Sequence, residues 1–357
     1  MFDPFLLAQQ VLDDVPFTKE AVLPLLTDHQ VPLTDILAAA FRIRSRYFGK
    51  EVTLHILNNV QNGACPEDCR YCAQSAGSSA AIAEYPMKSD HEILLEAEQA
   101  YKSGACRYCM VFSGSGPAPE RIEHLCHLVR EIKKRFTIEV CVSPGQIDYQ
   151  QAARLRAAGL DRLNHNLNTS LRNYANICTT HTFTDRLETL RAARAADLAV
   201  CSGLIVGMGE TAEDLVDIAL TFRTLGVHSI PVNFLIPVSG LDIPGARPLT
   251  PEYCLRVLCM FRFLNPKTEI RMAAGRELHL RSLQVMGLFA ANSLFLSGYL
   301  NVGGHPDVET LQMIRDAGFD IRSEIPLDEL ILSARGTAGL IPLKTINELR
   351  PCQTQES

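Results

Sequence analysis

The sequence alternates eight short strand-like runs with amphipathic runs of helical period, and this order restricts the fold more than any other feature. Several helical runs begin at Ser, Thr, Pro or Asp and end at Gly, as helices commonly do. Such alternation predicts βα units around a parallel sheet. We expect an α/β fold, a (βα)8 TIM-type barrel, although periodicity does not show closure and a doubly wound open sheet stays possible. The strand-like runs are 52–59, 106–114, 137–143, 161–167, 199–207, 228–235, 268–274 and 293–298.

The domain organisation follows from where this alternation begins and ends. The chain has 357 residues, which is long for one domain but usual for a barrel. We expect an N-terminal helical extension at 1–48, the barrel at 49–320 and a short C-terminal extension at 321–357. We expect no interdomain linker.

Charge and composition exclude several classes of partner. The net charge is −6 and there is no long basic run, so we expect no nucleic acid partner. We also expect no membrane partner and a cytoplasmic location, because the chain has no leader-like start and no apolar run of about 18 residues. Twelve cysteines in a reducing compartment favour metal ligation over disulfides.

Three of those cysteines lie within eight residues. Cys65, Cys69 and Cys72 form a C-x3-C-x2-C motif in "NGACPEDCRYCAQS". An odd trio does not form disulfides among itself, and a structural zinc site usually takes four protein ligands. Three thiolates on a four-iron cluster would instead leave one iron open. We therefore expect an iron–sulfur centre, with zinc as the alternative.

The position of this motif agrees with a metal centre. It directly follows the first predicted strand, and the βα loops of a barrel lie at its C-terminal face, where active sites are built. The topology alone thus places the three cysteines at the barrel mouth.

The motif resembles that of the radical S-adenosylmethionine enzymes, including an aromatic residue, Tyr71, before the third cysteine. Within that superfamily, the chain is similar to the biotin synthase family over about 45–320. The segments that carry the resemblance occur in family order: "GACPEDCRYCAQS", "YCMVFSGSGP", "NHNLNTS", "TTHTFTDRLETL", "VCSGLIVGMGE", "SIPVNFL", "EIRMAAGRE" and "AANSLFLSGYL".

The resemblance implies an enzyme, a sulfurtransferase that inserts sulfur into dethiobiotin to form biotin. It implies that the three motif cysteines hold a [4Fe–4S] cluster that binds S-adenosylmethionine and generates a 5′-deoxyadenosyl radical. It also implies an auxiliary [2Fe–2S] cluster as sulfur donor, and no catalytic residue beyond the cluster ligands. The implied auxiliary ligands each lie on a different predicted strand, as a shared buried centre requires: Cys109, Cys141, Cys201 and Arg271.

The remaining cysteines are interpreted as packing residues. Cys106 is three residues from Cys109, an odd separation that points the two side chains to opposite faces of a strand unless a bulge intervenes. The others lie in helical runs, loop or tail, where a free cysteine usually packs as a small apolar residue: Cys126, Cys178, Cys254, Cys259 and Cys352.

Amide side chains suit the neutral ureido ring of dethiobiotin. By resemblance, Tyr71, Asn166, Asn168 and Arg186 contact S-adenosylmethionine, and Asn166 and Asn233 contact the substrate. Some relatives have aspartate where Asn168 stands. The structural alternatives are strand-end turns for the asparagines and a solvated helix face for Arg186.

Two other functions remain open from the sequence. One is another radical S-adenosylmethionine enzyme, a mutase or methyl-modifying enzyme, on the same barrel. The other is a zinc-stabilised protein without activity. The resemblance further implies a small electron-transfer protein as reductant and a homodimer.

Overall fold

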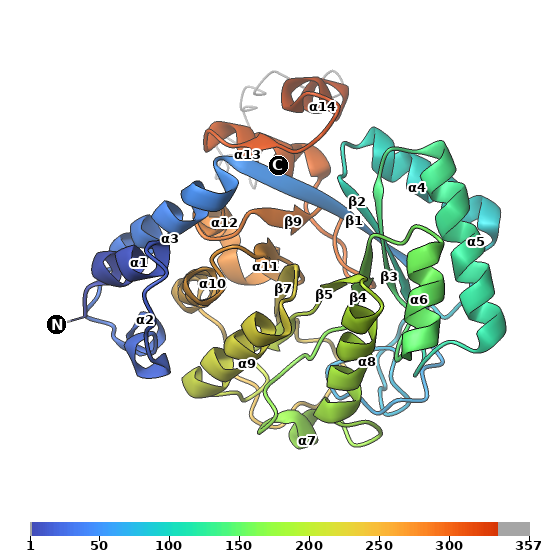
Figure 1. The fold of residues 1–357 in the computed structure, drawn as a ribbon, viewed down its shortest axis with the longest axis horizontal. Coiled ribbons are helices and arrows are strands. Elements are labelled where there is room, and N and C mark those ends of the chain that lie inside the picture. The colour runs from blue at the N-terminus through green and yellow to red at the C-terminus, as the bar shows by residue number, and fades with distance from the viewer. Residues whose placement is uncertain (1, 335–357) are drawn as a thin grey trace, which may run out of the picture.

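The computed structural model describes residues 2–334. Its strands are parallel and run in the order β1, β2, β3, β4, β5, β7, β8, β9, and β9 pairs with β1. The sheet therefore closes, which confirms the predicted barrel and excludes the open sheet (Figure 1). The strands are β1 (Glu51–Gln61), β2 (Arg107–Phe112), β3 (Glu139–Ser143), β4 (Arg162–Asn164), β5 (Ala199–Cys201), β6 (Leu204–Val206), β7 (Ser229–Phe234), β8 (Glu269–Met272) and β9 (Ser293–Phe295).

One expected strand, 199–207, is broken into β5 and β6, which both pair with β7. The break lies at Gly203, where a Cβ atom would stand 2.0 Å from the carbonyl oxygen of Pro231. Only glycine permits this close approach of two backbones. The two pieces together fill one of the eight strand positions of the barrel, between β4 and β7.

Helices surround the barrel, and several of them begin after a Ser, Thr or Asp residue (Figure 1). Ser89, Asp148, Thr182 and Thr211 each form a capping box, which satisfies free N–H groups of the first turn. The helices are α4 (Asp90–Lys102), α5 (Pro119–Arg135), α6 (Tyr149–Ala157), α7 (Tyr174–Ile177), α8 (Phe183–Ala195), α9 (Ala212–Leu225), α10 (Pro251–Leu264), α11 (Arg276–Leu280), η2 (Arg281–Leu283) and α12 (Gln284–Gly287).

Further elements lie at both ends of the barrel segment. The N-terminal region is helical, as predicted, with α1 (Pro4–Leu12), η1 (Lys19–Ala21), α2 (Pro24–Thr27) and α3 (Leu33–Phe48). After the barrel come α13 (Asp307–Asp316), β10 (Asp320–Ile321), which pairs with the start of β1, and α14 (Leu327–Ala334). The expected tail beyond 334 lies outside the described residues. No helix in 2–334 combines the length and apolar composition that crossing a bilayer requires.

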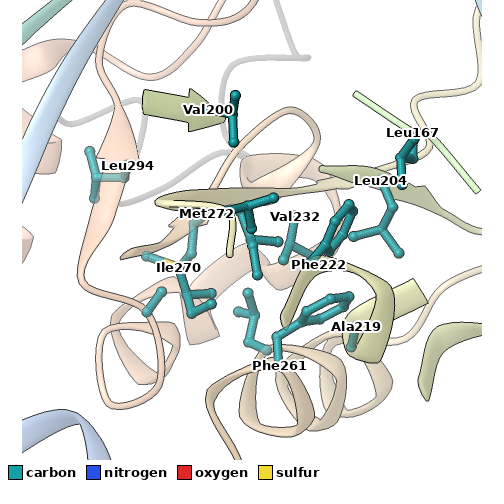
Figure 2. Packing of buried hydrophobic residues seen from close by; sticks show 14 of the residues in the cluster. Leu167, Val200, Leu204, Ala219, Phe222, Val232, Phe261, Ile270, Met272 and Leu294 are labelled. Atoms are coloured by element: carbon teal, nitrogen blue, oxygen red, sulfur yellow. The ribbon is translucent and has the colours of Figure 1, made fainter. Parts of the chain in front are cut away.

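The main apolar core lies between the barrel wall and its helices. Figure 2 shows Phe222 of α9 and Phe261 of α10 packed beside Val232, Ile270 and Met272 of the strands. The two phenylalanine rings are 6.4 Å apart between centroids. Because this face of the wall is filled with apolar side chains, the polar and thiol residues of the same strands are directed to the other face, inside the barrel.

Candidate active site

A cavity of about 440 Å³ occupies the interior of the barrel and its mouth. It gathers side chains from the first βα loop and from strands far apart in the sequence. Of the predicted site residues, those that line it are Cys65, Cys69, Tyr71, Cys72, Cys109, Cys141, Asn166, Asn168, Arg186, Asn233 and Arg271. Cys201 lies immediately behind this lining, with its sulfur 3.9 Å from Nη1 of Arg271.

The cysteine loop is fixed to the segment that joins α7 to α8. Asp68 accepts hydrogen bonds from the backbone N–H groups of Thr179 and Thr180, at 2.9 and 3.2 Å. The N–H of Arg70 donates to the carbonyl oxygen of Ile177 at 2.9 Å. These backbone contacts hold the loop, and with it the three thiols, over the cavity.

Two residues that were not predicted as site residues contact Cys69. Its sulfur lies 3.7 Å from the sulfur of Cys178 and 3.4 Å from Nε2 of His181. The hydrogen bond with Cys178 and burial together raise the pKa of Cys69. Cys178 was predicted to pack, and it is buried, but nothing in the sequence pattern announced its contact with the cysteine motif.

The second set of thiols lies deeper in the barrel. Cys109 and Cys141 are directly opposite in the β2–β3 register, and both are buried. The hydrogen bond from Cys141 lowers the pKa of the Cys109 thiol well below its usual value, while the same contact raises the pKa of Cys141. Phe295 packs with this pair, and its ring also lies 5.0 Å below the guanidinium of Arg271. Three buried thiols beside one guanidinium are a donor set that suits an iron–sulfur centre.

Arg271 is held by groups on the side away from Cys201. Its Nη2 donates to the hydroxyl of Ser229 at 2.8 Å and to the carboxylate of Glu269. Burial opposes ionisation of Glu269, but Arg107 and Arg271 nevertheless hold its pKa well below its usual value. Within the described residues Nε of Arg271 has no hydrogen-bond partner.

Glu269 is the centre of this buried charge network and was missed by the sequence analysis. Arg107 and Arg162 lie 3.4 and 3.2 Å from its carboxylate oxygens, and Nε2 of His55 lies 3.1 Å away. Its position two residues before Arg271 on one strand places both side chains on the same face, which is a signal that sequence reasoning can use.

Arg186 is not on a solvated helix face. Its Nε donates to the hydroxyl of Tyr174 at 2.6 Å, and its Nη1 donates to the backbone oxygen of Asn166 at 2.9 Å. The side chain therefore points from the start of α8 into the cavity, in agreement with a binding role rather than with the solvated alternative.

The three predicted asparagines differ in how many of their amide atoms form hydrogen bonds. Asn168 has φ of 69°, a conformation that asparagine tolerates, and its Nδ2 donates to the hydroxyl of Tyr71 at 2.6 Å. Asn166 accepts from the N–H of Gly203 at 2.9 Å, and no group in 2–334 accepts from its Nδ2. Asn233 donates to the backbone oxygen of Leu204 and accepts from the N–H of Ala274, so both polar atoms of its amide bond the backbone.

The other cysteines that were predicted to pack, where the structure describes them, do not line this cavity. Cys106 precedes β2, and it is Cys109 that lines the cavity, as the odd separation predicted. Cys126, Cys254 and Cys259 are buried in α5 and α10, as expected for packing residues. The strand that carries Cys141, β3, ends at Ser143, immediately before Pro144. Cys352 lies outside the described residues.

Two family profiles match adjoining parts of the chain. The radical SAM superfamily matches residues 60–222, and the Biotin and Thiamin Synthesis associated domain matches residues 231–320. Both matches lie within the predicted barrel segment.

Individual proteins are similar over nearly the whole chain. A biotin synthase of Acaryochloris marina is 53% identical over 88% of this chain and 91% of its own length. One of Leptospira interrogans is 49% identical over 96% and 97% of the two chains. Among solved structures, methylornithine synthase (PylB) superposes with a TM-score of 0.74 at 20% identity, covering 88% of this chain and 96% of its own. That likeness supports the fold alone.

Proposed function

The chain belongs to the biotin synthase family of radical S-adenosylmethionine enzymes, and from this membership we propose how its own residues insert sulfur into dethiobiotin. The cofactors of such an enzyme are a [4Fe–4S] cluster, S-adenosylmethionine and an auxiliary [2Fe–2S] cluster. When bound, they supply a 5′-deoxyadenosyl radical and a sulfur atom. The observation that carries the proposal is the convergence of two separate thiol sets on one cavity.

Cys65, Cys69 and Cys72 are proposed to hold the [4Fe–4S] cluster. All three line the cavity mouth, and thiolates are the ligands that such clusters take. Because the loop itself supplies three thiols, these residues would hold the cluster and leave it able to bind S-adenosylmethionine at the cavity mouth.

Tyr71, Asn166, Asn168 and Arg186 are proposed to bind S-adenosylmethionine. The Tyr71–Asn168 hydrogen bond connects the cysteine loop to the end of β4, so both residues face the same part of the cavity. Arg186 is fixed by Tyr174 and by the backbone of Asn166, and it brings a positive charge to the site. That charge is complementary to a carboxylate.

Cys109, Cys141, Cys201 and Arg271 are proposed to hold the auxiliary cluster. A protonated guanidinium has no acceptor lone pair, and Glu269 raises the pKa of Arg271 against the effect of burial. We therefore propose that Arg271 contributes chiefly position and charge, and that Glu269 and Ser229 hold it in place. A mutase or methyl-modifying enzyme needs no sulfur source, so this set argues against that alternative.

Dethiobiotin is proposed to lie between the two thiol sets. The free Nδ2 of Asn166 can donate to the ureido oxygen of the substrate, and Oδ1 of Asn233 keeps one lone pair for a ureido N–H. Apolar groups such as Leu57, Phe295 and Tyr299 line the same cavity and exclude water from the carbon atoms that react.

We also propose the domain organisation, the cellular location and the protein partners. We assign catalysis to the barrel at 49–320, with the regions 1–48 and 321–357 as extensions. A cytoplasmic location fits the absence of a membrane-spanning helix in 2–334. A small electron-transfer protein as reductant and a homodimer rest on the family resemblance.

The test is a single-turnover assay with anaerobically loaded enzyme, dethiobiotin, S-adenosylmethionine and dithionite. We expect biotin and 5′-deoxyadenosine to appear together, with sulfur in biotin derived from enzyme labelled with a sulfur isotope in its inorganic sulfide. Biotin carrying only unlabelled sulfur would refute the role of the second thiol set.

A further inference from the structure

We propose that the cluster-free chain binds one divalent metal ion of the zinc class through Cys69, Cys178 and His181, in a state that excludes the [4Fe–4S] cluster. These three side chains are buried, and their ligand atoms lie within 4.8 Å of one another. The competition with the cluster, though not the metal site itself, rests on the proposed role of Cys69.

The distances between the three ligand atoms match the edges of a tetrahedron. Zinc bonds of about 2.3 Å to sulfur and about 2.0 Å to nitrogen place two sulfur ligands about 3.8 Å apart, and sulfur and nitrogen about 3.5 Å apart. The two sulfurs are 3.7 Å apart, and Nε2 of His181 lies 3.4 Å from each. One ion above this triangle would contact all three atoms, with the guanidinium of Arg186 displaced from Nε2 of His181.

The histidine has the tautomer that a metal ligand needs. Nη2 of Arg186 lies 3.2 Å from Nε2 of His181, and because a guanidinium only donates, Nε2 must carry a lone pair. The ring proton is then on Nδ1, which donates to the hydroxyl of Tyr174 at 2.9 Å. Such a partner on the second ring nitrogen is typical of ligating histidines.

The local charge is also suitable. Two thiolates neutralise a divalent ion, and the charge of Arg186 is offset by Glu67, whose carboxylate lies 3.9 Å from Nε2 of His181. The fourth position is left to water or to that carboxylate. Two sulfurs and one imidazole select zinc or a similar borderline ion over magnesium or calcium.

The two states exclude each other because both use the sulfur of Cys69. A zinc ion bound here occupies one of the three thiolates that the cluster needs, and it holds the cysteine loop against the segment between α7 and α8. The site therefore acts as a holding state that protects Cys69 and delays cluster assembly until zinc is removed.

The test begins with the reduced, cluster-free full-length protein under anaerobic conditions. One equivalent of Co²⁺ is expected to produce thiolate charge-transfer absorption and the intense visible bands of tetrahedral cobalt, which Zn²⁺ then abolishes. Cys178→Ser and His181→Gln are each expected to weaken binding by more than about 100-fold, since removal of a ligand should exceed the loss from an outer partner.

Two matched controls separate this site from others. Cys126→Ala removes a buried cysteine of α5 and is expected to bind Co²⁺ as the unsubstituted chain does. Cys65→Ala removes a member of the cysteine motif that is outside the proposed triangle, and it too should retain the tetrahedral spectrum. A chain that binds through the motif alone would instead lose the spectrum in Cys65→Ala and keep it in both Cys178→Ser and His181→Gln, which would overturn the proposal.

Iron uptake distinguishes this inference from the proposed function. Zn²⁺ is expected to slow cluster reconstitution of the unsubstituted chain but not of Cys178→Ser, whereas Cys65→Ala fails to assemble the first cluster with or without zinc. An octahedral cobalt spectrum of the unsubstituted chain would refute the metal site and leave the cluster assignment intact.

Discussion

Nη1 of Arg271 faces the sulfur of Cys201 inside the barrel, at 3.9 Å, although the two residues lie on different strands and 70 positions apart. The other terminal nitrogen of the guanidinium is engaged by Glu269 and Ser229. Glu269 and Ser229 thus hold Nη2 of the arginine, while its Nη1 is directed toward the thiol of Cys201.

This arrangement predicts different results for Arg271→Met and Cys141→Ala. Methionine has similar reach but no charge, so Arg271→Met should shift the spectrum and potential of the auxiliary cluster while some biotin is still formed. Cys141→Ala removes a thiolate, the stronger ligand for iron, and should lose auxiliary iron. Iron per chain, visible spectra and biotin per turnover check both. An unchanged spectrum in Arg271→Met would show that the arginine is not beside the cluster.

Glu269→Gln is expected to destabilise the protein strongly. The carboxylate is buried among Arg107, Arg162 and Arg271, and its removal leaves buried positive charge uncompensated. We expect a loss of about 3–5 kcal/mol in the free energy of unfolding, measured by denaturant titration. Glu252→Gln on α10 is the control, because that carboxylate is exposed even though it pairs with buried Arg256, and it should cost about 1 kcal/mol or less. Equal effects of the two changes would contradict the central place of Glu269.

Cys201→Ala separates the two cysteine sets by activity. The proposed ligand of the auxiliary cluster is removed while Cys65, Cys69 and Cys72 are unchanged. The variant should therefore still cleave S-adenosylmethionine to 5′-deoxyadenosine but form no biotin. Normal biotin yield from this variant would disprove the role of Cys201.

A buried histidine gives a pH dependence of stability. Burial, together with Arg186, lowers the pKa of His165 well below its usual value of 6.5, so the folded state keeps the ring neutral. The contribution of the neutral His165 ring to the free energy of unfolding is complete above pH 6.5. It is lost as the pH falls, because the unfolded state then binds a proton that the folded state does not. We expect a slope of up to about 1.4 kcal/mol per pH unit below that point.

His165→Gln provides the comparison for this prediction. The difference in free energy of unfolding between the unsubstituted protein and the variant should shrink, or change sign, from pH 7.5 to pH 5.5. A difference that is constant over that range would show that His165 does not carry the effect. Both proteins must be measured in the same state of cluster loading.

The sequence predicted the fold because the fold depends on local patterns, whereas the candidate site residues outside the cysteine motif were proposed from the family resemblance. The period of the apolar residues and the helix caps define the βα units, and strand position determines that Cys109 and Cys141 point inward. Contacts that depend on the folding of loops were not predictable. Cys178 and His181 are more than 100 residues from Cys69, and hydrogen bonds of the Asp68 carboxylate and of the Arg70 backbone help to bring them together.

The broken strand and the particular backbone partners of Asn233 could not be predicted for a related reason. The break at Gly203 results from its contact with the backbone of Pro231, and the amide of Asn233 is used by Leu204 and Ala274 on neighbouring segments. Such contacts depend on the register between strands, which a single sequence does not reveal. The charge network around Glu269 likewise joins residues of β1, β2, β4 and β8.

The central claim is that one barrel holds two clusters on separate cysteine sets, one for radical formation and one for sulfur supply. Mössbauer spectra, with iron and sulfide content, of the anaerobically loaded wild type, Cys69→Ala and Cys201→Ala test it most directly. The wild type should show a [4Fe–4S] and a [2Fe–2S] component; Cys69→Ala should lose the first and all cleavage of S-adenosylmethionine, and Cys201→Ala should lose only the second. A single component in the wild type, lost equally in both variants, would contradict the account.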